Sequence, residues 1–266
     1  MSETPLTRHP DRYPKAALVT GAARRIGRRI ALELAADGWA VALHYNGSAE
    51  DAAAAVDEIE QTGGRAVALQ ADLASEAESS ALVPRAVEAL GPLGCLVNNA
   101  SVFELDLHDT ATRESWDRHM EPNLRAPFVL SQAFARALPD DQGGTIVNLL
   151  DQRVWNLTPF FTSYSLSKAG LWALTQSLAL ALAPRIRVNA IGPGPALPSP
   201  RQSQAQFDRQ SARMPLGRGT TAEEIAAAVQ FILAAPAMTG QMIALDGGQH
   251  LGWAQPPEGY RFPEDE

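Results

Sequence analysis

Two side chains that could catalyse proton transfer, Tyr164 and Lys168, stand four residues apart. On a helix this spacing puts both on one face, so the ammonium can lie close to the phenol. A phenol with an ordinary pKa of about 10 is a poor acid or base near neutrality, but a neighbouring cation favours its ionised form and lowers that pKa. The spacing therefore predicts that Tyr164 is a proton donor whose pKa is lowered by Lys168.

An acidic residue, Asp151, precedes Tyr164 by thirteen positions. An ionised aspartate cannot donate a hydrogen bond to a carbonyl oxygen and would repel a developing oxyanion. It suits a substrate that itself donates hydrogen bonds or needs a proton on nitrogen, as in reduction of a C=N bond. The structural alternative is that Asp151 forms a salt bridge with Arg153.

The elements that must position these residues follow a βα pattern, in which short runs rich in Val, Leu and Ile alternate with longer Ala-rich stretches. Strands are expected at residues 16–20, 40–45, 66–70, 95–98, 145–150, 187–190 and 242–245. Helices are expected near residues 25–37, 49–62, 76–90, 113–138, 163–183 and 222–233. Ser48 with Asp51, and Thr221 with Glu224, are expected to cap helix starts. The pattern predicts one α/β domain over residues 15–252, a Rossmann-like doubly wound seven-stranded parallel sheet with helices on both faces.

Three segments fall outside this pattern. Residues 1–14 are polar and are expected to form a flexible N-terminal segment, and residues 253–266 a C-terminal tail. Residues 193–214 are Pro-rich and then polar, and they follow the sixth strand, where open α/β sheets bind their ligands. They are the expected substrate loop, with an ordinary surface connection as the alternative.

Composition limits the classes of function. The net charge is −8 with both signs interspersed, which gives little support to a nucleic-acid surface. No apolar run is long enough for a membrane span, and the opening segment lacks the apolar centre of a secretory signal, so a cytoplasmic protein is expected. The single cysteine, Cys95, is expected in the core, and the five scattered histidines do not suggest a metal site.

A glycine-containing turn follows the first expected strand and opens a helix. Gly21 can make a tight turn, Gly27 can allow close helix packing, and the N–H groups of the helix start would receive a pyrophosphate. The second strand ends without the Asp or Glu that NAD-preferring proteins usually carry there.

This lack of an acid favours NADPH, because a 2′-phosphate could be held by Arg24, His44, Asn46 and Ser48. The alternative is that His44 and Tyr45 merely pack at the end of the strand.

These motifs resemble those of the short-chain dehydrogenase/reductase family, namely a TGxxxGxG turn, NNA and YxxxK, and the likeness spans about residues 15–252. The resemblance implies homotetramers, a nicotinamide ribose held by Lys168, and a water-mediated proton path supported by Asn123. It implies cofactor contacts from Gly21, Arg24, Arg25, Ile26, Gly27, His44, Tyr45, Asn46, Ser48, Asp72, Leu73, Asn99, Ala100, Ser101, Tyr164, Lys168, Pro193 and Gly194.

Three departures from the common family pattern are similar to the pteridine reductase branch: Arg25 for the middle glycine, Ser101 to Phe103 after NNA, and Asp151 for serine. This likeness implies that Phe103 stacks a pterin against the nicotinamide, while Arg25 and Ser101 bind its polar edge. Asp151 and Tyr164 would then protonate a ring nitrogen as hydride reaches carbon. The expected activity is NADPH-dependent reduction of dihydropterins such as dihydrobiopterin, dihydromonapterin or dihydrofolate.

Other readings of the same residues stay open. Phe103 could be a core residue and Ser101 a cap. The substrate could be a carbonyl or hydroxyl compound, or the protein could be a catalytically silent cofactor sensor, although a sensor has no need for the proton path. Arg153 and Trp155 follow no family pattern, and His250 and Trp253 are expected to reach a neighbouring subunit's pocket.

Overall fold

The computed structural model describes residues 13–199 and 201–252. The expected flexible segment at the N-terminus lies almost entirely outside these residues, and so do the C-terminal tail and Trp253.

Seven strands form a single parallel sheet in the order β3-β2-β1-β4-β5-β6-β7. The expected fold class, a Rossmann-like doubly wound sheet, is confirmed. The strand order reverses between β1 and β4, and open α/β sheets bind ligands beyond the carboxyl ends of the strands at such a point. The strands are β1 (Ala16–Val19), β2 (Ala40–Tyr45), β3 (Ala66–Gln70), β4 (Cys95–Asn98), β5 (Gly144–Leu149), β6 (Ile186–Pro193) and β7 (Met242–Leu245).

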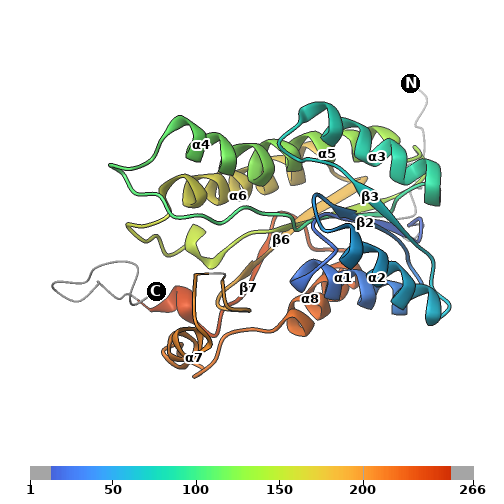
Figure 1. Ribbon diagram of the computed structural model, residues 1–266. Helices are drawn as coiled ribbons and strands as arrows, with labels where there is room; N and C mark the ends of the chain where they lie inside the picture. The colour runs from blue at the N-terminus through green and yellow to red at the C-terminus, as the bar shows by residue number, and fades with distance from the viewer. Residues whose placement is uncertain (1–12, 200, 253–266) are drawn as a thin grey trace.

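Helices cover both faces of the sheet, with α3, α5 and α6 above it and α1, α2 and α8 below it in Figure 1. In β1, Ala16 and Leu18 belong to one core and Ala17 and Val19 to the other, because successive side chains of a strand point to opposite faces. This is why the central strands are apolar throughout. The helices are α1 (Arg25–Ala36), α2 (Ala49–Gln61), α3 (Glu76–Leu90), α4 (Arg113–Met120), α5 (Ala126–Ala137), α6 (Thr162–Leu182), α7 (Gln204–Ala212) and α8 (Ala222–Ala234).

The single helix expected over residues 113–138 is interrupted. A π-helical turn, Glu121–Arg125, separates α4 from α5. Pro122 lies in this turn, and proline has no N–H to continue an α-helical ladder. The turn carries Asn123, and such π turns occur frequently at functional sites.

Two expected helix starts have different outcomes. The capping box of Thr221 and Glu224 is confirmed. The cap expected from Ser48 is wrong, because its side chain makes no capping hydrogen bond, and Asp51 instead pairs with Arg24 at 2.6 Å.

The expected substrate loop is partly helical, since α7 lies within it. A capping box of Ser203 and Gln206 starts this helix, and that spacing was a sequence signal for it.

Within the described part of the chain, the helices are too short or too polar to cross a membrane. The same residues contain no group of His, Cys, Asp and Glu arranged to hold a metal ion.

Candidate active site

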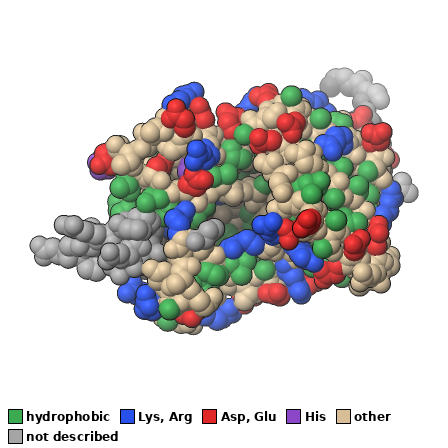
Figure 2. Space-filling view, viewed as in Figure 1, with side chains coloured by type: hydrophobic (Ala, Val, Ile, Leu, Met, Phe, Trp, Pro, Cys, Tyr) green, Lys and Arg blue, Asp and Glu red, His purple; other side chains and the backbone are tan. Residues whose placement is uncertain are grey.

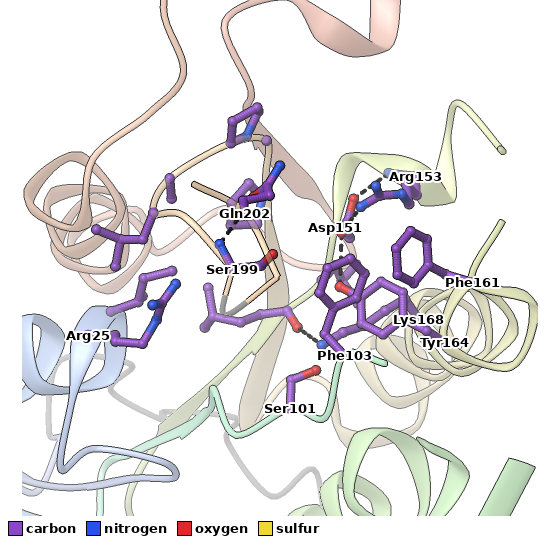
Figure 3. A pocket seen from close by; sticks show the side chains of 18 of the residues that line it. Arg25, Ser101, Phe103, Asp151, Arg153, Phe161, Tyr164, Lys168, Ser199 and Gln202 are labelled. Atoms are coloured by element: carbon purple, nitrogen blue, oxygen red, sulfur yellow. Dashed lines mark hydrogen bonds and ion pairs between the residues drawn. The ribbon is translucent and has the colours of Figure 1, made fainter. Parts of the chain in front are cut away.

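A cavity of about 470 Å³ opens at the carboxyl ends of β5 and β6. Its size falls in the range of small-molecule sites. Figure 3 shows Arg25 on one side of the cavity, with Phe103, Asp151 and Tyr164 on the other. Its lining includes the expected residues Arg25, Ile26, Asn99, Ser101, Phe103, Asp151, Tyr164, Lys168, Pro193 and Gly194.

Tyr164 and Asp151 are in direct contact. The Tyr164 hydroxyl donates a hydrogen bond to Asp151 Oδ2 at 2.9 Å. Burial raises the pKa of Tyr164 well above its ordinary value, the charge of Asp151 raises it further, and Arg153 acts in the opposite direction. The prediction that this pKa is lowered is therefore wrong, because a phenolate here would lose its hydration and face a carboxylate. Tyr164 is held in its protonated form, as a proton donor requires.

Lys168 lies on the same face of α6 as Tyr164, with its Nζ 5.8 Å from the centroid of the phenol ring. The ammonium donates to the Leu149 carbonyl at 2.8 Å. Burial lowers the pKa of Lys168 to about 8, and the nearby charge of Asp151 partly opposes this shift. Lys168 is thus a buried cation that titrates much closer to neutrality than a surface lysine.

Arg153 binds both oxygens of Asp151. Its backbone N–H donates to Oδ1 at 2.8 Å, and its guanidinium donates to Oδ2 at 3.1 Å. Both side chains are largely buried. The salt bridge weighed as the structural alternative is therefore present, and Oδ2 also receives the Tyr164 hydroxyl. One carboxylate serves both contacts.

Two phenylalanines form the aromatic wall of the cavity. Phe103 stacks on Phe161 with ring centroids 4.4 Å apart and an interplanar angle of 21°. It also makes an edge-to-face contact with Tyr164, with ring centroids 4.6 Å apart. Phe161 directly precedes α6 and has a left-handed backbone with φ of 59°. A bulky residue in that conformation is unusual, and such outliers cluster at functional sites.

The glycine-containing turn after β1 is tight and closely packed. Gly21 has φ of 64°, and a Cβ added to Gly27 would lie 2.2 Å from the Gly21 carbonyl oxygen. The tight turn expected at Gly21 and the close packing expected at Gly27 are both present. Asn99 holds the turn by donating to the carbonyl oxygens of Thr20 and Gly21. Arg25 also has a left-handed backbone, with φ of 54°, and its guanidinium donates to the Pro198 carbonyl.

His44 is buried, whereas it was expected to contact a 2′-phosphate. It is only 2% exposed, and its two ring nitrogens contact the Gly21 N–H and the Ala71 carbonyl at 3.0 Å each. Burial also lowers its pKa, so a neutral ring braces the turn. Arg24 and Asn46, in contrast, are exposed near the end of β2.

Asn123 is fully buried in the π turn and binds the segment that carries Ser101 and Phe103. Its side chain accepts from the Val102 N–H at 2.8 Å and donates to the Val102 carbonyl at 2.9 Å. It also donates to the Ser167 hydroxyl. Asn123 therefore holds in place the backbone between Ser101 and Phe103, which line the cavity.

Comparisons with known proteins identify the family of this chain. A family model described as Enoyl-(Acyl carrier protein) reductase matches residues 21–250. The chain is 36% identical over 242 residues to a 3-oxoacyl-(acyl-carrier-protein) reductase FabG of Staphylococcus aureus, covering 89% of this chain and 98% of that protein. This chain belongs to the short-chain dehydrogenase/reductase family.

Two solved structures extend the likeness. FolM alternative dihydrofolate reductase 1 from Brucella suis, in complex with NADP, has a TM-score of 0.88 and 48% identity, covering 91% of this chain and 97% of that one. A short chain dehydrogenase from Burkholderia cenocepacia, in complex with NADP, has a TM-score of 0.83 and 39% identity, covering 90% and 99%. The expectation of NADPH agrees with both.

Some expected contacts of this short-chain dehydrogenase/reductase lie away from the cavity. His250 packs on Trp155 of its own chain, with ring centroids 5.2 Å apart, and its Nδ1 lies 2.7 Å from Asp246. Expected cofactor residues outside the cavity lining are Gly21, Arg24, Gly27, His44, Tyr45, Asn46, Ser48, Asp72, Leu73 and Ala100.

Sequence reasoning missed a buried hydrogen-bond network around the start of α6, next to Tyr164. Asp106 accepts hydrogen bonds from the Ser163 N–H at 3.0 Å and from the hydroxyls of Ser163 and Ser115. His119 Nδ1 lies 2.7 Å from the Ser163 hydroxyl, and its Nε2 accepts from the Glu104 N–H. No local sequence motif predicts these contacts, because they join residues far apart in sequence. Phe161 and Arg201, which also line the cavity, were missed for the same reason.

Proposed function

We propose that the protein reduces dihydropterins with NADPH, and that Tyr164 delivers a proton to a ring nitrogen of the substrate. The hydrogen bond from the Tyr164 hydroxyl to Asp151 carries the proposal. A carboxylate beside the proton donor disfavours an oxyanion but favours a substrate with N–H groups.

The turn after β1 fits a dinucleotide phosphate. A Cβ at Gly27 would fill the cradle, and the first turn of α1 carries no acidic residue to repel an anion. Strand β2 contains no acidic residue, and Arg24, Asn46 and Ser48 follow or flank its end, which supports recognition of a 2′-phosphate. The phosphate would replace Asp51 as the partner of Arg24. When bound, NADPH supplies the hydride that reaches a ring carbon.

The chain's own residues then bind and protonate the substrate. Phe103 offers a flat face for a pterin ring, and Arg25 and Ser101 on the cavity lining offer hydrogen bonds to its polar edge. Asp151 accepts from an N–H of the ring and aims the Tyr164 hydroxyl. Lys168 holds the nicotinamide ribose and keeps positive charge near the phenol as its proton leaves.

The deciding experiment is NADPH oxidation by the purified protein with dihydrobiopterin, dihydromonapterin and dihydrofolate, beside a panel of ketones and with NADH in parallel. Turnover of pterins with NADPH in preference to NADH is expected. If no pterin is turned over, the proposal is wrong.

A second candidate is reduction of a carbonyl compound, because the curated relative is named a 3-oxoacyl reductase. The substitution Asp151→Ser distinguishes the two. It should abolish most pterin turnover, whereas a carbonyl reductase in which Asp151 is only structural would retain its activity.

We further propose that the protein is a cytoplasmic homotetramer. Exposed apolar side chains on the outer helices, Leu180 on α6 and Phe231 on α8, support an assembly that covers them. Light scattering during size-exclusion chromatography tests this proposal, and a monomer at micromolar concentration would refute it.

A further inference from the structure

The described part of the cavity wall is rich in cations, although the whole protein has a net charge of −8. The lining contains Arg25, Arg153, Lys168 and Arg201, with Asp151 as its acid. Figure 2 shows basic side chains bordering the hollow on this face. A cavity whose charge opposes that of the protein selects for anionic groups on its ligands.

Three of these cations already have a role in the site. Arg153 binds Asp151, Lys168 lies under Tyr164, and Arg25 stands at the start of α1 beside the phosphate turn. Arg201 is placed differently, since it comes from the segment before α7 and is exposed at the edge of the cavity.

Arg201 is held against the aromatic wall. One guanidinium N–H group donates to the Phe103 carbonyl at 3.0 Å, and the guanidinium carbon lies 4.9 Å from the Phe103 ring centroid and 5.2 Å from that of Phe161. A side chain that left a pterin stacked on Phe103 toward solvent would therefore pass close to this guanidinium. Gln202 and Gln210, joined by a hydrogen bond of 2.7 Å, also line the cavity.

We propose that Arg201 forms a subsite for a carboxylate on the substrate's side chain, so that the protein favours pterins with an acidic tail over those with uncharged hydroxylated tails. This inference rests on the proposed pterin reduction. A guanidinium presents a planar fork of N–H donors that matches the two oxygens of a carboxylate, and a hydroxylated tail cannot provide that charge.

The test is the substitution Arg201→Gln, assayed at saturating NADPH with dihydrofolate, which has an acidic tail, and with dihydrobiopterin, which has an uncharged one. The ratio of the two kcat/KM values should shift about five- to tenfold against dihydrofolate, mainly through its KM, since one partly solvated charge-assisted contact is lost. Raising the salt concentration should increase the wild-type KM for dihydrofolate more than that for dihydrobiopterin. Taking the ratio removes any general effect of the change on Phe103.

Arg209→Gln is the matched control, because Arg209 is an exposed arginine on α7 outside the cavity lining. It should leave the ratio within twofold of wild type, and Arg201→Lys should retain part of the preference. An unchanged ratio in Arg201→Gln overturns the subsite while leaving pterin reduction intact. Failure of the wild-type protein to turn over any pterin overturns both.

Discussion

The substitution Asp106→Ala should destabilise the protein and loosen its active site together. Asp106 is 3% exposed, and it lies in the segment that also carries Phe103. Its carboxylate caps α6 from a distance of 57 residues, because the residue at the N-cap position, Phe161, offers no side-chain cap. The backbone carbonyl of Asp106 also accepts from the Thr162 N–H, and the substitution leaves that contact in place.

The expected loss can be worked out from these contacts. The cap is the hydrogen bond from the Ser163 N–H group, and leaving this buried N–H group without an acceptor costs about 1–3 kcal/mol. The hydroxyls of Ser163 and Ser115 have other carbonyls within reach, so they add little. The expected loss is therefore about 1–3 kcal/mol, which corresponds to a fall in Tm of about 3–10 °C for a chain of this size.

Thermal unfolding of Asp106→Ala and Asp106→Asn measures this loss. Asparagine keeps an oxygen for the Ser163 N–H group, so it should recover more than half of the stability. Because the same segment holds Phe103 beside Tyr164, Asp106→Ala should also raise the KM for the pterin while leaving the KM for NADPH within twofold. A Tm within 2 °C of wild type would refute the role of Asp106 as a cap.

The pH dependence gives an independent check on Asp106. Burial by itself acts to raise the pKa of Asp106, but hydrogen bonds from Ser163 and Ser115 and the nearby His119 together lower it below its ordinary value of 3.8. The unfolded chain therefore takes up this proton first as the pH falls, so the stabilisation is present above about pH 4 and is lost as the pH falls through the folded-state pKa. The difference in Tm between wild type and Asp106→Asn should shrink below pH 4, and a difference that stays constant there would contradict the assignment.

Three further predictions concern single residues. Tyr164→Phe removes the proton donor and should lower kcat by about 10²- to 10⁴-fold while NADPH still binds, as measured by fluorescence titration; unchanged kcat would exclude Tyr164 as the donor. The charge of Lys168 should be lost as the pH rises through about 8. The affinity for NADPH should therefore weaken above that pH in wild type but not in Lys168→Arg. If NADPH affinity changes with pH in the same way in both proteins, Lys168 does not hold the nicotinamide ribose through its charge. Arg187 is buried in β6 and donates to the carbonyls of Ile232 in the last turn of α8 and of Ala235 and Met238 after it. Arg187→Gln should lower the free energy of unfolding by about 3 kcal/mol or more while kcat is preserved. A denaturant midpoint equal to that of wild type would contradict this.

The order and type of the elements could be predicted because they depend on local patterns. Each of these patterns spans only a few residues. They are the alternating apolar runs, the glycines of the first turn, and the spacing of Tyr164 and Lys168. The break at residues 121–125 and the helix α7 were missed, although Pro122 and the capping box at Ser203 were local signals for both.

The sequence by itself thus determined the fold, the glycine-containing turn after β1 and the face of α6 that carries Tyr164 and Lys168. Only the tertiary structure decided the direction of the Tyr164 pKa, because burial and the approach of Asp151 depend on how β5 and α6 pack. It also decided that Asp106 caps α6 and that Arg201 lies against Phe103. These contacts join residues separated by 57 and 98 positions, and a local pattern contains no information about which distant groups packing will bring within hydrogen-bond distance.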